Sequence, residues 1–202
     1  MTSYAINAQL DIVVADVYVG TEDDYVRPLV AYVLDSNTLV ILAYTVTWDS
    51  ERQAAAFNAI SRAHWAVRPS RKKNRASNTS SVYLATITTD MGNDLTLSKA
   101  MDFGAQIKRC RPQYGGVTER ITHYLNNGLI KTPKHGRYIY DSSVLPVSLS
   151  KFTRSLNKLV KSYNSNGLHN DDIAPLSHWE AEYHAPLPKG FRDRGSRSKP
   201  GA

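Results

Sequence analysis

The sequence predicts an α/β fold, in which one β-sheet is covered by helices on both faces. Three segments rich in β-branched residues come first in the chain. Segments with helical periodicity then alternate with further strand-like segments, an order that favours one sheet with helices packed against it. With 202 residues, of which 42% are hydrophobic, the chain is expected to form a single soluble domain with a sizeable core.

The first three strands are predicted to form an antiparallel meander. The first strand is the apolar run DIVVADVYVG at 11–20, and two more lie within the segment 27–48, separated by the turn signal DSNT. Asp35 is interpreted as a residue of that turn. Asp16 would lie in the middle of an apolar strand, where an ionised carboxylate requires a partner or a bound cation.

A helix is predicted after the meander, because Ser50 and Gln53 form a capping box and apolar residues recur with helical spacing up to Val67. The segment RPSRKKNRASNTSS at 68–81 has five basic residues and no large apolar residue, so it is predicted to be a loop. The elements expected next are a strand at 82–90, a short helix at 97–104 and a strand at 106–112.

The second half of the chain is predicted to be mostly helical. The segment YGGVTERITHYL at 114–125 places two glycines ahead of an amphipathic helix that carries Glu119 in its first turn. Apolar residues between positions 152 and 163 mark another amphipathic helix. The core domain is assigned to residues 8–180, and the basic segment 181–202 is predicted to be a disordered tail.

The net charge of +7 is unevenly distributed. The first 50 residues hold seven acidic residues and one basic residue, Arg27, so the excess of positive charge lies downstream. Such an excess favours a polyanionic partner such as DNA, with a merely solvated basic surface as the alternative. No apolar run is long enough to span a membrane and no signal peptide is recognisable, so a cytoplasmic, DNA-associated location is expected. Cys110, the single cysteine, excludes an internal disulfide and is interpreted as an inert packed thiol.

Three acidic residues lie where they could form one site. Asp16 lies in the first strand, Asp90 ends the fourth, and Glu119 begins the helix after the fifth. If the first and fourth strands are neighbours, the three carboxylates meet at one edge of the sheet. Their mutual repulsion would then require divalent cations between them. Asp11 and Asp16 are five positions apart, an odd number, so only one of the two can point at this site.

Four segments in this order resemble the catalytic core of the DDE transposase and retroviral integrase superfamily, especially transposases related to phage Mu transposase. They are VVADVYV with the following RPLVAYVLDSNTLVILAYTVT, ITTDMGN, PQYGGVTERITHYL, and YNSNGLHNDDIAPLSHW. The resemblance covers most of the chain. It implies a ribonuclease H-like fold, with three antiparallel strands, two further parallel strands, and helices on both faces of the mixed sheet.

The resemblance implies that Asp16, Asp90 and Glu119 bind two Mg²⁺ or Mn²⁺ ions, and Asp16 matches the family pattern better than Asp11 does. The implied activity is DNA strand cleavage and strand transfer by a transposase or integrase core. Implied partners are transposon ends and target DNA, further copies of the chain, and a transposition ATPase or a separate end-recognition subunit. The candidate DNA-contacting residues are Arg120, His123, Arg71, Lys72, Lys73 and Arg75.

The sequence also departs from the family pattern. Only 28 residues separate Asp90 from Glu119, fewer than in retroviral integrases. No helix-turn-helix is recognisable ahead of Ala15, and Trp179, interpreted as an anchor of the C-terminal segment, is not followed by a β-barrel sequence. Two alternatives therefore stay open: a ribonuclease H-like nuclease that only hydrolyses, and an inactive or domesticated remnant that binds nucleic acid.

Overall fold

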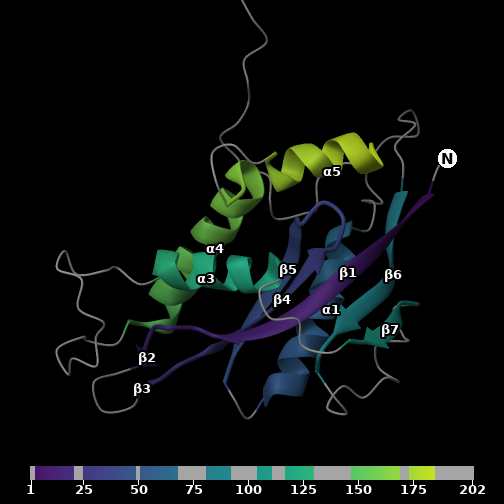
Figure 1. Ribbon diagram of the computed structural model, residues 1–202. Helices are drawn as coiled ribbons and strands as arrows, with labels where there is room; N and C mark the ends of the chain where they lie inside the picture. Colours follow the sequence, from purple (N-terminus) through teal and green to yellow (C-terminus); the bar gives the residue numbers. More distant parts are fainter. Residues whose placement is uncertain are drawn as a thin grey trace, which may run out of the picture.

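The computed structural model describes residues 3–20, 25–48, 51–67, 81–91, 104–110, 117–129, 147–168 and 173–184. The strands in this part of the chain are β1 (Ser3–Val14), β2 (Val19–Gly20), β3 (Tyr25–Val26), β4 (Leu29–Asp35), β5 (Ile41–Thr47), β6 (Ser81–Thr89) and β7 (Gln106–Arg109). The helices are α1 (Arg52–Val67), α3 (Val117–Leu129), α4 (Leu149–Asn166) and α5 (Pro175–Tyr183) (Figure 1).

The described residues form an α/β fold around a mixed five-stranded sheet in the order β5-β4-β1-β6-β7. β4 pairs antiparallel with β1 and β5, which confirms the predicted meander. β6 runs parallel to β1, and β7 runs parallel to β6. The first strand of the meander is therefore the direct neighbour of the strand that precedes Asp90, which is the condition for their acids to meet.

The first strand begins well before the predicted range 11–20. β1 starts at Ser3, and Ile6, Ala8 and Leu10 alternate as fully buried residues on one of its faces. The sequence signal for this part of the strand is weak because small and amide side chains separate the apolar positions. The buried strand thus includes residues that the sequence pattern left outside it.

The first strand also ends earlier than predicted. Its last residue is Val14, after which the backbone N–H of Ala15 donates to the carbonyl oxygen of Pro28 at 2.9 Å. The chain then enters a separate two-stranded ribbon of β2 and β3, where Val19 packs into the core against α4. Because Val19 is also buried, the apolar run of the sequence continues past the last residue of β1. Asp16 therefore lies beyond β1, and its predicted place in mid-strand was wrong.

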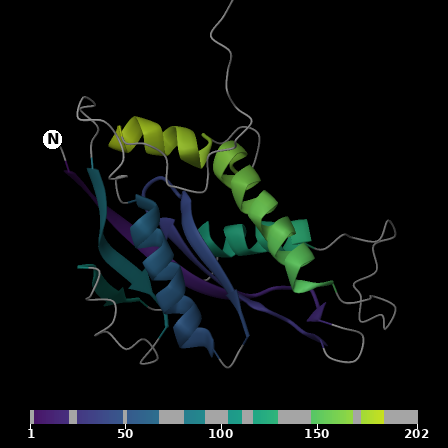
Figure 2. The same cartoon turned by 180° about the vertical axis from the view of Figure 1, so that it is seen from behind.

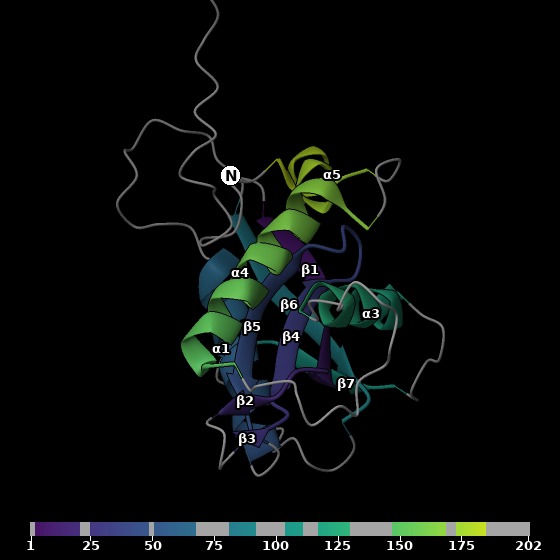
Figure 3. The same cartoon turned by 90° about the vertical axis from the view of Figure 1, so that its left-hand side faces the viewer.

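The sheet separates two apolar cores. α1 packs on one face, mainly through alanines, and α5 adds Trp179 and Tyr183 to the same core. α3 and α4 pack on the other face, around the buried side chain of Tyr32. Figure 3 shows the sheet between α1 on one side and α3 on the other, and Figure 2 shows α1 from the opposite side to Figure 1. Helices thus cover both faces, as the sequence predicts.

α4 is the amphipathic helix predicted between positions 152 and 163. The side chain of Ser148 caps its N-terminus by accepting from the backbone N–H of Lys151, and Gly167 ends it with a positive φ of 76°. Its apolar positions follow the helical spacing of three or four residues and are fully buried: Phe152, Leu156, Val160 and Tyr163. Local sequence and tertiary packing therefore agree along this helix.

α5 was not predicted as a helix. Pro175 occupies its first turn, where the missing backbone N–H costs no helical hydrogen bond. Trp179 is fully buried, and its ring packs edge-on against that of Tyr183 with 4.7 Å between the ring centroids. The interpretation of Trp179 as an anchor of the C-terminal segment is confirmed.

A buried carboxylate fastens α5 to the hairpin between β4 and β5. Asp35, which is fully buried, accepts hydrogen bonds from the backbone N–H and hydroxyl of Thr38, as a turn residue does. The hydroxyl of Tyr183 donates to both carboxylate oxygens at 3.0 Å. Burial, and then the charge of Asp35, raise the pKa of the Tyr183 hydroxyl, so it stays protonated and donates at neutral pH.

Several predicted features lie outside the described residues. They are residues 97–103 of the predicted short helix, residues 68–80 of the predicted loop, and the predicted tail from residue 185 onward. The described elements run from Ser3 to Tyr183, so packed structure extends past both ends of the range 8–180 assigned to the core domain.

Replacing Asp35 with Ala should lower the free energy of unfolding by about 3–5 kcal/mol, because Thr38 and Tyr183 would keep buried donors without an acceptor. Tyr183→Phe removes only one donor and should cost about 1–2 kcal/mol. Urea unfolding followed by circular dichroism measures both. A loss below about 1 kcal/mol for Asp35→Ala would show that the buried carboxylate does not hold α5 in place.

Candidate functional site

Asp11 lies on the face of β1 that is covered by α3 and α4. Its half-buried carboxylate accepts a hydrogen bond from the backbone N–H of Ile12 at 2.8 Å. The hydroxyl of Tyr32, its pairing partner on β4, lies 3.4 Å from the other carboxylate oxygen. Alternation along the strand directs the neighbouring Leu10 to the opposite core. The carboxylate of Asp11 is thus partly buried at the edge of the core between the sheet and α3 and α4.

Asp90 lies beside Asp11 on the adjacent parallel strand. The β1–β6 register pairs Gln9 with Thr88, and two further residues along each strand bring Asp11 level with Asp90, which directly follows β6. Asp90 is exposed, whereas Asp11 is half-buried. The two acids lie near the same end of two neighbouring strands, where side chains with a shared function often gather.

The shift in the pKa of Asp11 also indicates that Asp11 and Asp90 lie close together. Burial raises the pKa of the Asp11 carboxyl above its ordinary value of 3.8, and the negative charge of Asp90 raises it further. The hydrogen bonds from Ile12 and Tyr32 act in the opposite direction. The negative form of Asp11 is therefore disfavoured in the protein alone, a cost that a cation near the two carboxylates would relieve.

Glu119 lies in the first turn of α3, as predicted, and is exposed. One turn further along this helix, the hydroxyl of Thr122 lies 3.1 Å from the hydroxyl of Tyr32. Residues three apart share one side of a helix, so Glu119 and Thr122 project from the same side of α3. The chain of contacts from Asp11 through Tyr32 to Thr122 brings the start of α3 toward the two strand acids.

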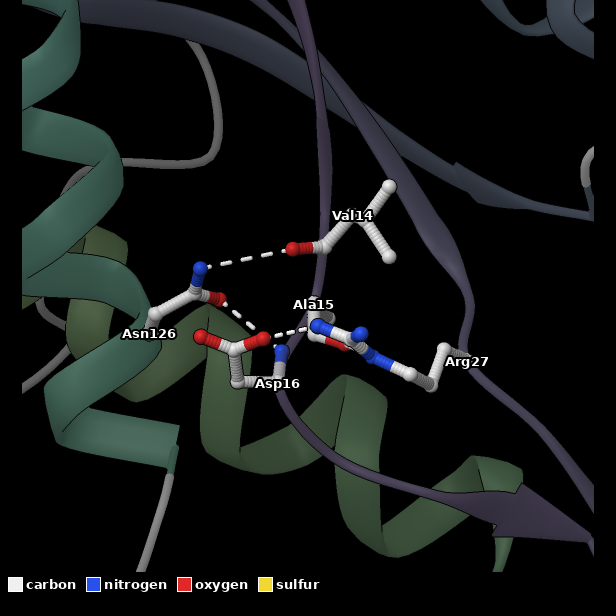
Figure 4. Close-up of polar contacts among 5 residues, drawn as sticks. All are labelled: Val14, Ala15, Asp16, Arg27 and Asn126. Carbon is white, nitrogen blue, oxygen red and sulfur yellow. Dashed lines mark hydrogen bonds and ion pairs between the residues drawn. The ribbon is translucent and has the colours of Figure 1, made fainter. Parts of the chain in front are cut away.

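Asp16 belongs to a different cluster. Its carboxylate forms an ion pair with Arg27, whose Nε also donates to the carbonyl oxygen of Ala15 at 3.2 Å (Figure 4). The backbone N–H of Asp16 donates to the side-chain oxygen of Asn126 on α3, and the Asn126 amide donates to the carbonyl oxygen of Val14. These bonds fix the second half of α3 against the end of β1.

Within the described residues, Asp16, Asp90 and Glu119 form no group that could hold a metal ion. Asp16 lies five residues beyond Asp11, and the three residue-to-residue steps along β1 from Asp11 to Val14 alone span about 10 Å. Its side chain is 47% exposed, so it needs no cation to offset burial. The structure brings Asp11, the other acid of the predicted first strand, close to Asp90, while the catalytic role expected for Asp16 stays a prediction.

The metal-binding capacity of this arrangement rests on carboxylates. Carboxylate oxygens are the ligands that Mg²⁺ and Mn²⁺ prefer, and the crowding of Asp11 and Asp90 fits such an ion. Within the described residues, no group of three or more His, Cys, Asp or Glu side chains is close enough to hold a metal ion. Glu119 is thus positioned on the neighbouring helix without completing a cluster with the two strand acids.

The other predicted site residues are dispersed. Arg120 and His123 are exposed on α3, and a His123 ring nitrogen lies 2.8 Å from the side-chain amide of Asn127. Their role in binding DNA stays a prediction. Four predicted DNA contacts lie outside the described residues: Arg71, Lys72, Lys73 and Arg75.

Cys110 lies next to the candidate site. Its backbone N–H donates to the carbonyl oxygen of Thr89, the residue before Asp90. Burial raises the pKa of the Cys110 thiol, and the charges of Asp90 and Asp11 raise it further. The thiolate, which is the reactive form, is therefore disfavoured, in agreement with the interpretation of an inert thiol.

Comparison of the chain with protein-family models gives no match, and comparison with curated proteins gives none either. None of the described helices combines the length and the apolar character that crossing a membrane requires.

The sequence contained a signal for Asp11 that depended on knowing the strand ends. The odd separation of Asp11 and Asp16 predicts that only one of them faces the site, provided that the strand continues through both. An uninterrupted apolar run hid the end of the strand at Val14 and made Asp16 look like the buried acid. Arg27, which pairs with Asp16, lies 11 residues away in the sequence and gave no local sign of that contact.

Replacing Asp11 with Asn should raise the free energy of unfolding of the metal-free protein, because it removes a half-buried charge that faces Asp90. A carboxyl whose pKa is raised by folding stabilises less as the pH rises, so the gain should grow between pH 4 and pH 7. Asp16→Asn, the matched control, should instead lose about 0.2–1 kcal/mol with the ion pair to Arg27. Urea unfolding across this pH range measures both.

The opposite order of effects would contradict the assignment. A loss of stability in Asp11→Asn at pH 7, with a gain in Asp16→Asn, would make Asp16 the repelled acid and Asp11 a structural one.

Proposed function

We propose that this chain is the catalytic core of a metal-dependent polynucleotidyl transferase with a ribonuclease H-like fold, which cuts and joins DNA during transposition. The observation that carries the proposal is the proximity of Asp11 on β1 to Asp90, which directly follows the parallel neighbour β6, beside the helix that carries Glu119 in its first turn. The resemblance to DDE transposases and integrases supplies the reaction class. The proposed acidic site consists of Asp11, Asp90 and Glu119, whereas Asp16 pairs with Arg27.

The strand arrangement supports the fold part of the proposal. An antiparallel meander continues through its first strand into two parallel strands, which is the mixed sheet that the resemblance implies. The site also lies where such a sheet gathers functional side chains, at the strand ends and at the start of a flanking helix. A fold alone does not define an activity, so the acidic residues carry the functional part.

The proposed roles follow from the environments of the acids. Two Mg²⁺ or Mn²⁺ ions, when bound, would activate the attacking oxygen and stabilise the leaving oxygen at a phosphodiester. Asp11 and Asp90 would hold cations from the sheet, and Glu119 would close the site from α3. Tyr32 would orient Asp11 through its hydroxyl and, through Thr122, would fix the distance of α3 from the sheet.

The proposed partners are transposon ends and target DNA. The positive charge beyond residue 50 supports binding through phosphate groups, with little sequence preference. Joining two DNA ends requires two active sites to act together, which supports a homo-oligomer. A transposition ATPase or a separate end-recognition subunit remains part of the proposal through the resemblance.

Asp11→Asn, Asp90→Asn and Glu119→Gln should each reduce DNA cleavage in Mg²⁺ or Mn²⁺ by at least about a hundredfold, because each removes a proposed metal ligand. Asp16→Asn should stay within about tenfold of the unmodified protein, since its carboxylate pairs with Arg27 instead. A gel assay on labelled duplex DNA measures the rates. Full activity of the Asp90→Asn variant would exclude the proposed site.

A transferase and a nuclease differ in what attacks the phosphodiester. Supplied with pre-cut donor ends that carry a free 3′-hydroxyl, the protein should join them to target DNA and yield branched products. The same reaction with donor ends that carry a 3′-deoxy terminus should yield none, which controls for the nucleophile. Cleavage without any joined product would favour the nuclease. Loss of both, with DNA binding retained, would favour an inactive remnant.

A further inference from the structure

α4 carries a line of basic residues without any acidic residue in the helix. Lys151, Arg154, Lys158 and Lys161 follow one another at spacings of three, four and three residues, which places them on one side of an α-helix. We call these four residues the α4 basic stripe. The 18 residues of the helix contain no Asp or Glu.

The packing of α4 fixes where this stripe points. The opposite side of the helix is fully buried against the sheet and α3, so the helix cannot rotate about its axis. Lys151, Arg154 and Lys158 are exposed, and Lys161 is half-buried at the far end. In Figure 3, α4 runs along the outside of the molecule over its whole length. The stripe is thus a rigid surface feature.

Within the part of the chain that the structure describes, no salt bridge offsets the positive charge of the stripe. Like charges three or four residues apart destabilise a helix, and the stripe contains three such neighbouring pairs. Surface helices usually offset such repulsion with acids at the same spacing. Within the described residues, the four side chains of the stripe form no salt bridge. The ion pair of Arg27 with Asp16 does not involve them. An external anion would remove the repulsion.

We propose that the α4 basic stripe is a binding surface for the phosphate backbone of nucleic acid. From Lys151 to Lys161 the helix rises about 15 Å, which corresponds to about four nucleotides along one strand at 3.4 Å each. Asn157 and Ser162 are exposed on the same helix and are further donors to phosphate oxygens. A row of cations matches a row of phosphates better than it matches a single small anion.

A membrane surface fits the stripe less well. Interfacial helices insert an apolar face among the lipids, whereas the apolar face of α4 is occupied by the core. The surface is also separate from the acidic site, so the inference does not depend on the proposed catalytic activity. It concerns binding only and is testable without metal ions.

The test is DNA binding by the full chain in EDTA, measured by fluorescence anisotropy on a 20-base-pair duplex at a series of salt concentrations. The stripe variant is Lys151→Gln, Arg154→Gln and Lys158→Gln together. It should bind at least about tenfold more weakly at 100 mM salt, and its log-log salt slope should fall by about 2 to 3, because each phosphate contact contributes about 0.9.

The matched control lowers the net charge by the same three units on α1, on the other face of the sheet. It combines Gln53→Glu, Ala54→Glu and Asn58→Glu, which are all exposed positions. Its salt slope should change by less than about 1. An unchanged slope in the stripe variant would overturn the proposal, and so would an equal loss in both variants. Binding of the unmodified protein to anionic phospholipid vesicles and not to the duplex would assign the stripe to a membrane surface.

A second measurement uses the unmodified protein and so does not depend on whether the variants fold. Acetylation of lysines, read by mass spectrometry, should be reduced at Lys151 and Lys158 when the duplex is added. Undiminished labelling of both residues at saturating DNA would overturn the proposal. Failure of the acidic-site variants to lose activity would leave both measurements unaffected, so the two proposals fail separately.

Discussion

The parallel pairing of β1 with β6 is the constraint on which the candidate site depends. Its register brings Asp11 level with Asp90, although 78 residues separate them in the sequence. The proximity has an energetic cost, because burial and the neighbouring charge raise the pKa of the Asp11 carboxyl. A fold that keeps two acids in this arrangement carries a penalty that a bound cation would offset, which is common at functional sites.

Two sets of hydrogen bonds hold α3 against the sheet, one in each half of the helix. Near the start of the helix, Thr122 contacts the hydroxyl of Tyr32, which in turn contacts Asp11. Near the end, the side chain of Asn126 donates to the carbonyl oxygen of Val14, the last residue of β1, and accepts from the backbone N–H of Asp16. The helix that carries Glu119 is therefore fixed at two points, as expected where a side chain must be placed accurately against groups on another element. Asp16 contributes to this support through its backbone N–H, which donates to Asn126.

Two groups of charged residues with opposite signs carry the proposed functions. The acids lie at strand ends and at the start of α3, whereas the α4 basic stripe lies on a helix that packs on the same face of the sheet. A polyanion held by such a stripe would bring phosphate groups to the side of the molecule where the acids lie. Phosphate contacts of this kind position a nucleic acid without reading its sequence. Recognition of particular DNA ends would then come from other segments or other subunits.

The sequence by itself determined the α/β class, the antiparallel meander, and helices α1, α3 and α4, because hydrophobic periodicity and helix caps are local signals. It also placed Asp90 at the end of a strand and Glu119 in the first turn of a helix. Tertiary structure alone decided where β1 ends, because Ala15 bonds to Pro28 there while the apolar run continues into another core. It likewise decided that Asp11 lies close to Asp90 and that Asp16 pairs with Arg27. These placements depend on the β1–β6 register and on Arg27, which are contacts between segments distant in sequence and leave no local pattern.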